Sequence, residues 1–216
     1  MAAYSRDPAV SAREEVLGRI RAALADVPPD DEVPIPRNHQ RTAPPDVDVA
    51  HLFAERVADY RATVHRVPAG EVAATVAAAL AQHGVRRVVV PADLPPEWLA
   101  ASEAEVVRDD GSLSASALDA LDGVVTAAAV GIAETGTIVL DGGTAQGRRA
   151  LSLVPDTHLC VVRTDQVVGT VPEGVARLDP VRPLTWISGP SATSDIELQR
   201  VEGVHGPRTL VVLLVD

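Results

Sequence analysis

One short segment, residues 131–137 (GIAETGT), places a carboxylate among hydroxyl groups and glycines. Glu134 has the chemistry of a nucleophile, a general base or a metal ligand. Thr135 and Thr137 add hydroxyl groups, and Gly136 would let a ligand approach the backbone closely. An equally good interpretation is a tight connection in which Glu134 and Thr135 bond to nearby amides. Glu134 is therefore a candidate catalytic residue, and its three neighbours are candidate substrate contacts.

A second segment, residues 188–197 (SGPSATSDIE), follows a predicted strand with small hydroxyl residues and a glycine. If a helix begins here, its amide groups and the positive end of its dipole would attract an anion. The alternative is an ordinary helix cap with two acidic residues in the first turn, which would compete with an anion. The candidate contacts for a small carboxylate or phosphate are Ser188, Gly189, Ser191, Thr193 and Ser194.

His205 lies in a glycine–proline turn, residues 204–208 (VHGPR), just before the last predicted strand. Held at a sheet edge, a histidine can transfer a proton or bind a carboxylate, although the turn is equally well explained as structural. We expect His205 to share one pocket with residues 134–137 and 188–194, because all three segments adjoin the ends of predicted strands.

Arg148, in residues 146–150 (QGRRA), is a candidate clamp for a carboxylate, although such an arginine more often pairs with an acidic neighbour. His158 and Cys160 lie two residues apart, on one face of a predicted strand. Two such groups alone do not form a metal site. We predict no bound metal and a core or loop position for His158.

All 19 basic residues are arginine, because the chain has no lysine. Schiff-base chemistry, covalent attachment of pyridoxal phosphate and a Walker A loop all need a lysine and are excluded. The 30 acidic residues give a net charge of −11, which argues against a nucleic-acid partner and against adhesion to anionic membranes. Fixed positive charge in a binding site must come from arginine or from a metal.

Cys160 is the single cysteine, and it cannot supply the roughly four thiolates of an iron–sulfur cluster. No complete GxGxxG fingerprint follows a predicted strand, so we predict no cofactor. The chain lacks a basic start followed by an apolar run, and no stretch approaches the roughly 18 apolar residues of a membrane span. These observations predict a cytoplasmic protein.

Residues 1–50 are expected to form an arm outside the main domain. Apolar residues recur at helical spacing within residues 9–26, with Ser11 and Glu14 as a capping pair. Six prolines then follow between residues 26 and 50, which favours an extended tether. The arm either docks loosely on the domain or serves as a handle for a partner.

Residues 51–216 show the alternating pattern of an α/β domain. Apolar, β-branched runs predict strands, and helical spacing predicts helices between them. The expected strands are residues 62–67, 86–90, 105–108, 123–126, 137–141, 159–163, 184–188 and 209–215, and the expected helices are residues 51–60, 71–83 and 116–121. This order favours a mainly parallel sheet flanked by helices, whose site lies where strands end and loops begin.

Together these motifs resemble the lactate-utilisation protein C family, which is built on the LUD domain. The resemblance covers roughly residues 50–216 and rests on residues 118–126 (LDALDGVVT), 132–140 (IAETGTIVL), 146–151 (QGRRAL), 153–156 (LVPD), 158–162 (HLCVV), 188–197 and 201–207 (VEGVHGP). It implies a fold similar to the NagB/RpiA/CoA-transferase group. It also implies a role in oxidising L-lactate to pyruvate beside two partners that carry iron–sulfur clusters.

Three functions follow from these observations. The first is a non-redox component of a lactate-oxidising system that works with iron–sulfur proteins. The second is a stand-alone acyl or CoA transferase, or a hydrolase, acting on a small anion through Glu134, by analogy with the glutamate nucleophile of CoA transferases of related fold. The third is a pure interaction protein that docks through its arm.

Overall fold

The structure is a computed structural model that describes residues 11–28, 34–193, 201–203 and 205–216. Two compact units divide the chain, residues 1–39 and residues 40–216. In the first unit, helix α1 (Ala12–Ala23) begins at the predicted capping pair. Ser11 Oγ accepts the Glu14 amide at 3.3 Å, and the Glu14 carboxylate accepts the Ser11 amide at 2.9 Å.

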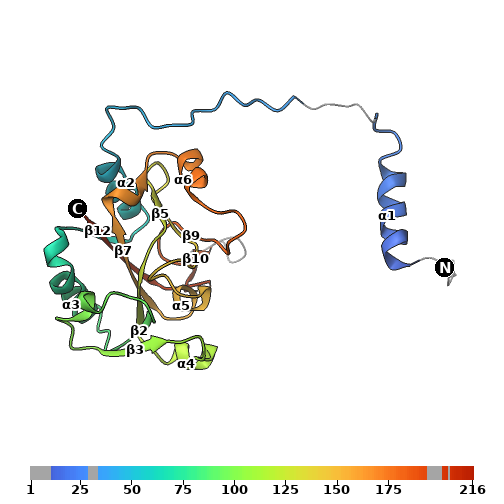
Figure 1. Cartoon of the computed structure of the whole chain (residues 1–216). Coiled ribbons are helices and arrows are strands. Elements are labelled where there is room, and N and C mark those ends of the chain that lie inside the picture. The colour runs from blue at the N-terminus through green and yellow to red at the C-terminus, as the bar shows by residue number, and fades with distance from the viewer. Residues whose placement is uncertain (1–10, 29–33, 194–200, 204) are drawn as a thin grey trace. The chain divides into compact units, whose positions relative to one another are not determined.

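Six strands form the main sheet of the second unit (Figure 1). Their order is β1 (Thr63–Val67), β12 (Thr209–Val215), β7 (Thr157–Arg163), β4 (Gly123–Ala127), β2 (Arg87–Pro91) and β3 (Glu105–Asp109). Every neighbouring pair is parallel, which confirms the predicted α/β architecture. The central strands are buried because other elements cover both faces of the sheet.

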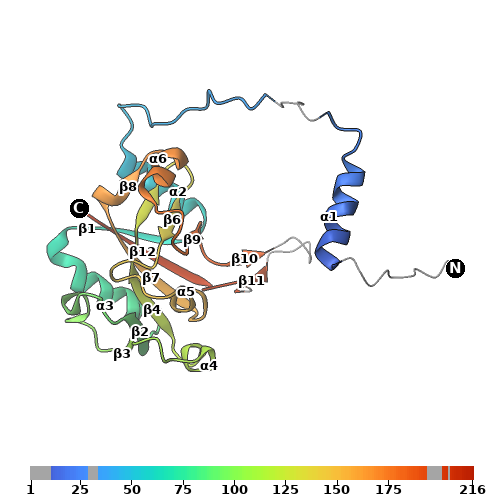
Figure 2. The same ribbon diagram turned by 45° about the vertical axis from the view of Figure 1, so that its right-hand side comes forward.

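Strand β12 shows how this sheet divides the core. Val211, Leu213 and Val215 pack on one face with helix α3 (Val72–Gln82). The alternate residues Leu210, Val212 and Leu214 pack on the other face with helix α2 (Val49–Asp59). Successive side chains of a strand point to opposite faces, so one apolar run serves both layers. Figure 2 shows β12 between helices α2 and α3.

A separate four-stranded sheet packs beside α2. Its order is β8 (Val167–Val168), β5 (Val130–Ile132), β6 (Thr137–Leu140) and β9 (Thr185–Ile187). Strands β5, β6 and β9 are antiparallel, and β8 is parallel to β5. The strands predicted at residues 137–141 and 184–188 therefore exist but lie outside the parallel sheet. The connection from β5 to β6 is too short for the crossover that parallel strands require.

Short elements complete the second unit. The helices are α4 (Ala115–Asp119), α5 (Arg149–Leu153) and α6 (Val171–Arg177), and the 3-10 turns are η1 (Ala69–Glu71), η2 (Pro96–Leu99) and η3 (Thr164–Gln166). Strands β10 (Ala192–Thr193) and β11 (Val201–Glu202) pair antiparallel. The helix that residues 188–197 could open does not begin at residues 188–193, where the chain instead forms β10, and residues 194–200, with the candidate residue Ser194, lie outside the described residues.

Candidate functional site

Hydroxyl groups connect the two segments that the sequence analysis singled out. Strands β6 and β9 pair with Ile138 opposite Ile187, so Thr137 and Ser188 lie next to each other. Their hydroxyl oxygens are 2.7 Å apart, and Thr135 Oγ1 is 2.7 Å from Thr137 Oγ1. The tertiary structure thus brings Thr135, Thr137 and Ser188 together as a chain of hydrogen bonds.

Glu134 bonds to helix α6 and is not part of this chain of hydroxyls. Its Oε1 accepts the amide of Val171, the first residue of α6, at 2.7 Å. Its own amide donates to Gly169 O at 3.0 Å. The carboxylate thus lies at the positive end of a helix, where it satisfies an amide that has no partner within the helix. The neighbouring Gly136, at φ +56°, packs against the backbone of Arg56, where a side chain would collide.

Ser188, Gly189, Ser191 and His205 line one cavity of about 250 Å³, which we call the serine-lined cavity. Ser191 Oγ accepts the His205 amide at 3.0 Å and so joins the two segments. Thr193 contributes backbone to β10 beside them. Because His158 and Leu210 also line this cavity near the beginnings of β7 and β12, it lies at the amino ends of the parallel strands.

His158 belongs to strand β7 and is fully buried beside strand β4. Its Nε2 lies 2.8 Å from Thr126 Oγ1, which also donates to Cys160 Sγ at 3.7 Å. Burial lowers the pKa of His158 to about 4 and raises the pKa of Cys160 to about 12. Both side chains are therefore neutral near pH 7, and the structure places His158 in the core, one of the two positions that the sequence predicted for it.

Arg148 forms an ion pair with an acidic residue of the domain, Asp109. Its Nε and Nη2 donate to the two carboxylate oxygens of Asp109 at 2.8 and 3.0 Å, and Nη2 also donates to Leu113 O at 2.6 Å. The side chain of Asp109 is only 4% exposed. Hydrogen bonding to Asp109 raises the pKa of Arg148 further. The arginine therefore ties the end of β3 to the start of α5 and does not line the serine-lined cavity.

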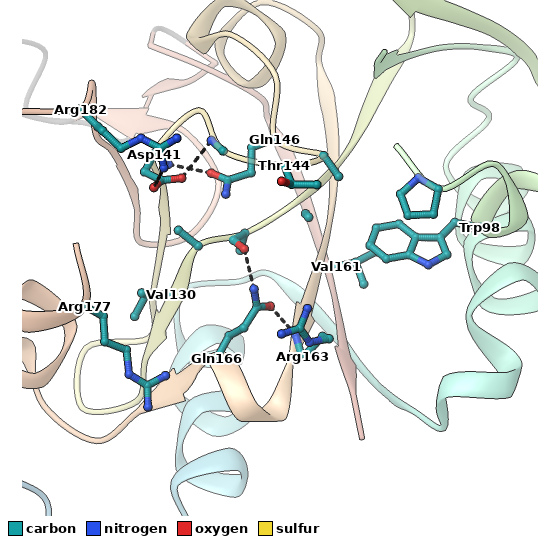
Figure 3. A pocket seen from close by; sticks show the side chains of 16 residues that line it. Trp98, Val130, Asp141, Thr144, Gln146, Val161, Arg163, Gln166, Arg177 and Arg182 are labelled. Atoms are coloured by element: carbon teal, nitrogen blue, oxygen red, sulfur yellow. Dashed lines mark hydrogen bonds and ion pairs between the residues drawn. The ribbon is translucent and has the colours of Figure 1, made fainter. Parts of the chain in front are cut away.

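A larger cavity, of about 570 Å³, lies at the opposite ends of the strands (Figure 3). Ala127, the last residue of β4, and Arg163, the last residue of β7, both line it. The carboxyl ends of parallel strands are the usual location of ligand sites in α/β sheets. Arg163, Arg177 and Arg182 line this space, which we call the arginine-lined cavity.

A tightly built loop, residues 141–146, forms one wall of the arginine-lined cavity. Asp141 Oδ1 accepts the Gly143 amide at 2.9 Å, and Gln146 Oε1 accepts the Asp141 amide at 2.7 Å. Ala145 has φ +58°, a left-handed conformation that is rare outside glycine, and its amide donates to Asp93 Oδ2 at 2.9 Å. Strained backbone of this kind clusters at ligand sites.

The three arginines of this cavity are held in different ways. Arg182 forms an ion pair with Asp141, and Arg163 forms a bidentate pair with Asp165 at 2.9 and 3.1 Å. Arg177 donates from Nη1 to the Asp165 carbonyl at 3.0 Å and forms no ion pair with any residue that the structure describes. Arg177 thus keeps guanidinium donors for an anion.

Sequence reasoning missed this arginine-lined cavity. The absence of lysine directs attention to the arginines, and Arg163 ends a predicted strand. The run Ala127–Ala129 is a second signal, because small side chains after a buried strand leave room for a ligand. Nothing in the local sequence indicates that Arg177 and Arg182, from α6 and the segment after it, reach the same space.

Among the residues that the structure describes, no group of three or more His, Cys, Asp or Glu side chains gathers in a way that could hold a metal ion. In the same part of the chain, no helix is both long and apolar enough to cross a bilayer.

Comparison with known proteins gives consistent matches. The family described as the LUD domain matches residues 50–215. A lactate utilization protein C from Deinococcus radiodurans is 49% identical over 210 residues, covering 94% of this chain and 95% of that protein. A protein of the same name from Geobacillus thermodenitrificans is 29% identical over 167 residues, covering 67% of this chain and 69% of that protein. The crystal structure of a DUF162 family protein from Deinococcus radiodurans matches with a TM-score of 0.66 at 47% identity, covering 78% of this chain and 96% of that chain.

Proposed function

The chain belongs to the LUD domain family, and on that premise we propose that it is the non-redox component of an L-lactate utilisation system. In this role it holds an anionic ligand in the arginine-lined cavity, while iron–sulfur partner proteins carry the electrons. The names of its relatives support a role in lactate utilisation. The chemistry of this chain supports the assignment of electron transfer to partner proteins.

Oxidation of a 2-hydroxy acid needs an acceptor for two electrons. The one cysteine of this chain supplies too few thiolates for a cluster, and burial raises its pKa to about 12, so it is protonated near pH 7. The electrons must therefore pass to a group on another protein or to a bound molecule. The resemblance to the lactate-utilisation protein C family favours iron–sulfur partners for this step. We place the system in the cytoplasm, where a free cysteine such as Cys160 is common.

The position of the arginine-lined cavity is the observation that carries the proposal. Lactate and pyruvate are carboxylates, and arginine recognises a carboxylate with paired N–H donors. Arg177 retains such donors at the carboxyl ends of β4 and β7. The serine-lined cavity, by contrast, has no arginine among the described residues that line it.

A reconstituted assay tests this proposal. L-Lactate oxidation is measured for the chain alone, for the iron–sulfur partners alone and for the mixture, and only the mixture should be active. Arg177→Met should lower the activity of the mixture at least tenfold. The matched control is Arg86→Met, which removes the same charge from an exposed residue just before β2.

Three outcomes would contradict parts of the proposal. Lactate oxidation by the chain alone would rule out a non-redox role. Full activity of the partners without the chain would show that the chain is not a component of the system. Normal activity of Arg177→Met combined with loss in Ser188→Ala/Ser191→Ala would move the ligand to the serine-lined cavity.

A further inference from the structure

The arginine-lined cavity has two chemically different ends. Figure 3 shows Trp98 on one side and Arg177 and Arg182 on the opposite side, with Val130 and Val161 between them. A ligand that fills this space meets an aromatic, apolar surface at one end and guanidinium groups at the other. The cavity therefore also suits a molecule that joins an apolar ring to an anionic group.

The apolar end is fixed in place by the core. Trp98 belongs to the 3-10 turn η2 and packs against the core cluster that includes Leu80 and Leu94 while it also lines the cavity. The run Ala127–Ala129 supplies small side chains that leave the space open beside it. An indole anchored in this way offers a planar surface at little cost in conformational entropy.

The cationic end carries more positive than negative charge. Three arginines line the cavity, and two of them are paired with carboxylates, Arg182 with Asp141 and Arg163 with Asp165, which leaves the positive charge of Arg177 uncompensated by an ion pair among the described residues. In a protein with a net charge of −11, such a local excess of arginine is a specific feature of this wall. Arg177 keeps donors that match the oxygens of a phosphate or carboxylate.

The volume of the arginine-lined cavity narrows the class of ligand that it can enclose. Cavities of about 300–1,000 Å³ typically enclose ligands of drug size. At about 570 Å³ this cavity has room for a molecule much larger than lactate or pyruvate.

We infer that the arginine-lined cavity binds a nucleoside phosphate, with the base against Trp98 and the phosphate at Arg177. The inference rests on the proposed function only in that both require an anion at Arg177. It goes further because it assigns a role to Trp98 and names an aromatic base as the second part of the ligand.

Calorimetric titration of the full chain with ADP, inorganic pyrophosphate, adenosine and pyruvate tests this inference. ADP should bind at least about tenfold more tightly than pyrophosphate or adenosine, the gain expected when a base stacks on an aromatic side chain. Trp98→Leu should remove this gain and leave the affinity for pyrophosphate unchanged. Trp98→Phe, which keeps a ring, should retain most of the ADP affinity. Arg177→Met should weaken both ADP and pyrophosphate, and Arg86→Met should weaken neither.

Fluorescence gives a second readout that does not depend on activity. The chain has two tryptophans, so in Trp186→Phe the emission reports Trp98 alone. ADP should quench this emission, whereas pyrophosphate should leave it nearly unchanged.

The outcomes separate this inference from the proposed function. Equal affinities for ADP and pyrophosphate, with no effect of Trp98→Leu, would overturn the role of the base and leave the anion site standing. Binding of pyruvate at Arg177 without binding of ADP would do the same. If neither pyruvate nor any phosphate bound, both the inference and the anion site would be wrong.

Discussion

Arg148 and Asp109 face each other as a bidentate ion pair, with N···O distances of 2.8 and 3.0 Å. The aspartate is almost completely buried, while the arginine side chain is 37% exposed. An arginine that looks like a substrate clamp in the sequence thus neutralises a buried carboxylate. The Arg148–Asp109 pair should therefore contribute to the stability of the domain.

Replacing Arg148 by methionine should lower the free energy of unfolding by about 2 kcal/mol, because the carboxylate of Asp109 loses its charged hydrogen-bond donors. Urea unfolding measures the change. Arg66→Met, in an exposed pair with Asp216, is the matched control and should cost less than about 1 kcal/mol. Adding Asp109→Asn to Arg148→Met should restore part of the loss, and a purely additive effect of the two changes would argue against the pair.

His158 should make stability depend on pH in a defined direction. Burial lowers its pKa from 6.5 in the unfolded chain to about 4, so the unfolded state binds more protons between these values. Its contribution to stability is therefore complete above pH 6.5 and is lost as the pH falls toward 4. Between pH 7.5 and pH 5 the loss should be about 2 kcal/mol.

Urea unfolding at both pH values checks this dependence. In His158→Gln the loss between pH 7.5 and pH 5 should be about 2 kcal/mol smaller than in the wild type. His39→Gln, which changes an exposed histidine outside the main domain, should keep the wild-type dependence. An unchanged pH dependence in His158→Gln would refute the assignment.

Cys160 should resist thiol reagents in the folded protein. Burial raises its pKa to about 12, and the thiolate is the reactive form. Ellman's reagent at pH 8 should therefore give almost no colour until denaturant is added, and then one equivalent, because the chain has one cysteine. Rapid labelling of the native protein would show that the β4–β7 region opens readily.

Glu134 should stabilise the domain through its hydrogen bond to the first residue of helix α6. Glu134→Ala removes the acceptor of the Val171 amide and should cost about 1 kcal/mol, whereas Glu134→Gln keeps an oxygen acceptor and should cost less. Glu55→Gln, an exposed change on α2, should have little effect. If Glu134→Gln abolished reconstituted lactate oxidation without loss of stability, the carboxylate would have a chemical role, as the transferase hypothesis requires.

Two truncations should separate the arm from the domain. Deleting residues 1–39 should leave the stability of the remaining domain within about 0.5 kcal/mol, because the compact unit begins at Gln40. Deleting residues 1–48 should cost about 2 kcal/mol, since it removes Asp48, whose carboxylate caps α2 at 2.9 Å, and the Arg41 carbonyl that accepts Thr170 Oγ1 at 2.8 Å. If the deletion of residues 1–39 abolished partner-dependent activity without unfolding the domain, the arm would be the docking element. Equal stability of the two truncations would contradict the contribution of residues 40–48 to the domain.

The sequence by itself determined the parallel sheet and the capping of α1. Both features follow from local chemistry, because apolar runs specify strands and helical spacing with a Ser–Glu pair specifies a helix start. The contact of Thr137 with Ser188, by contrast, depends on the antiparallel pairing of β6 with β9 across 51 residues, and residues 134–137 do not line the serine-lined cavity that they were predicted to share with His205.

Only the tertiary structure decided which charges meet. Arg148 reaches Asp109 across 39 residues, and Arg182 reaches Asp141 across 41. The order of strands and the path of each connection set these distances, and no local spacing encodes them. For the same physical reason Arg177 joins Trp98 around one cavity, although the two residues come from distant segments of the chain.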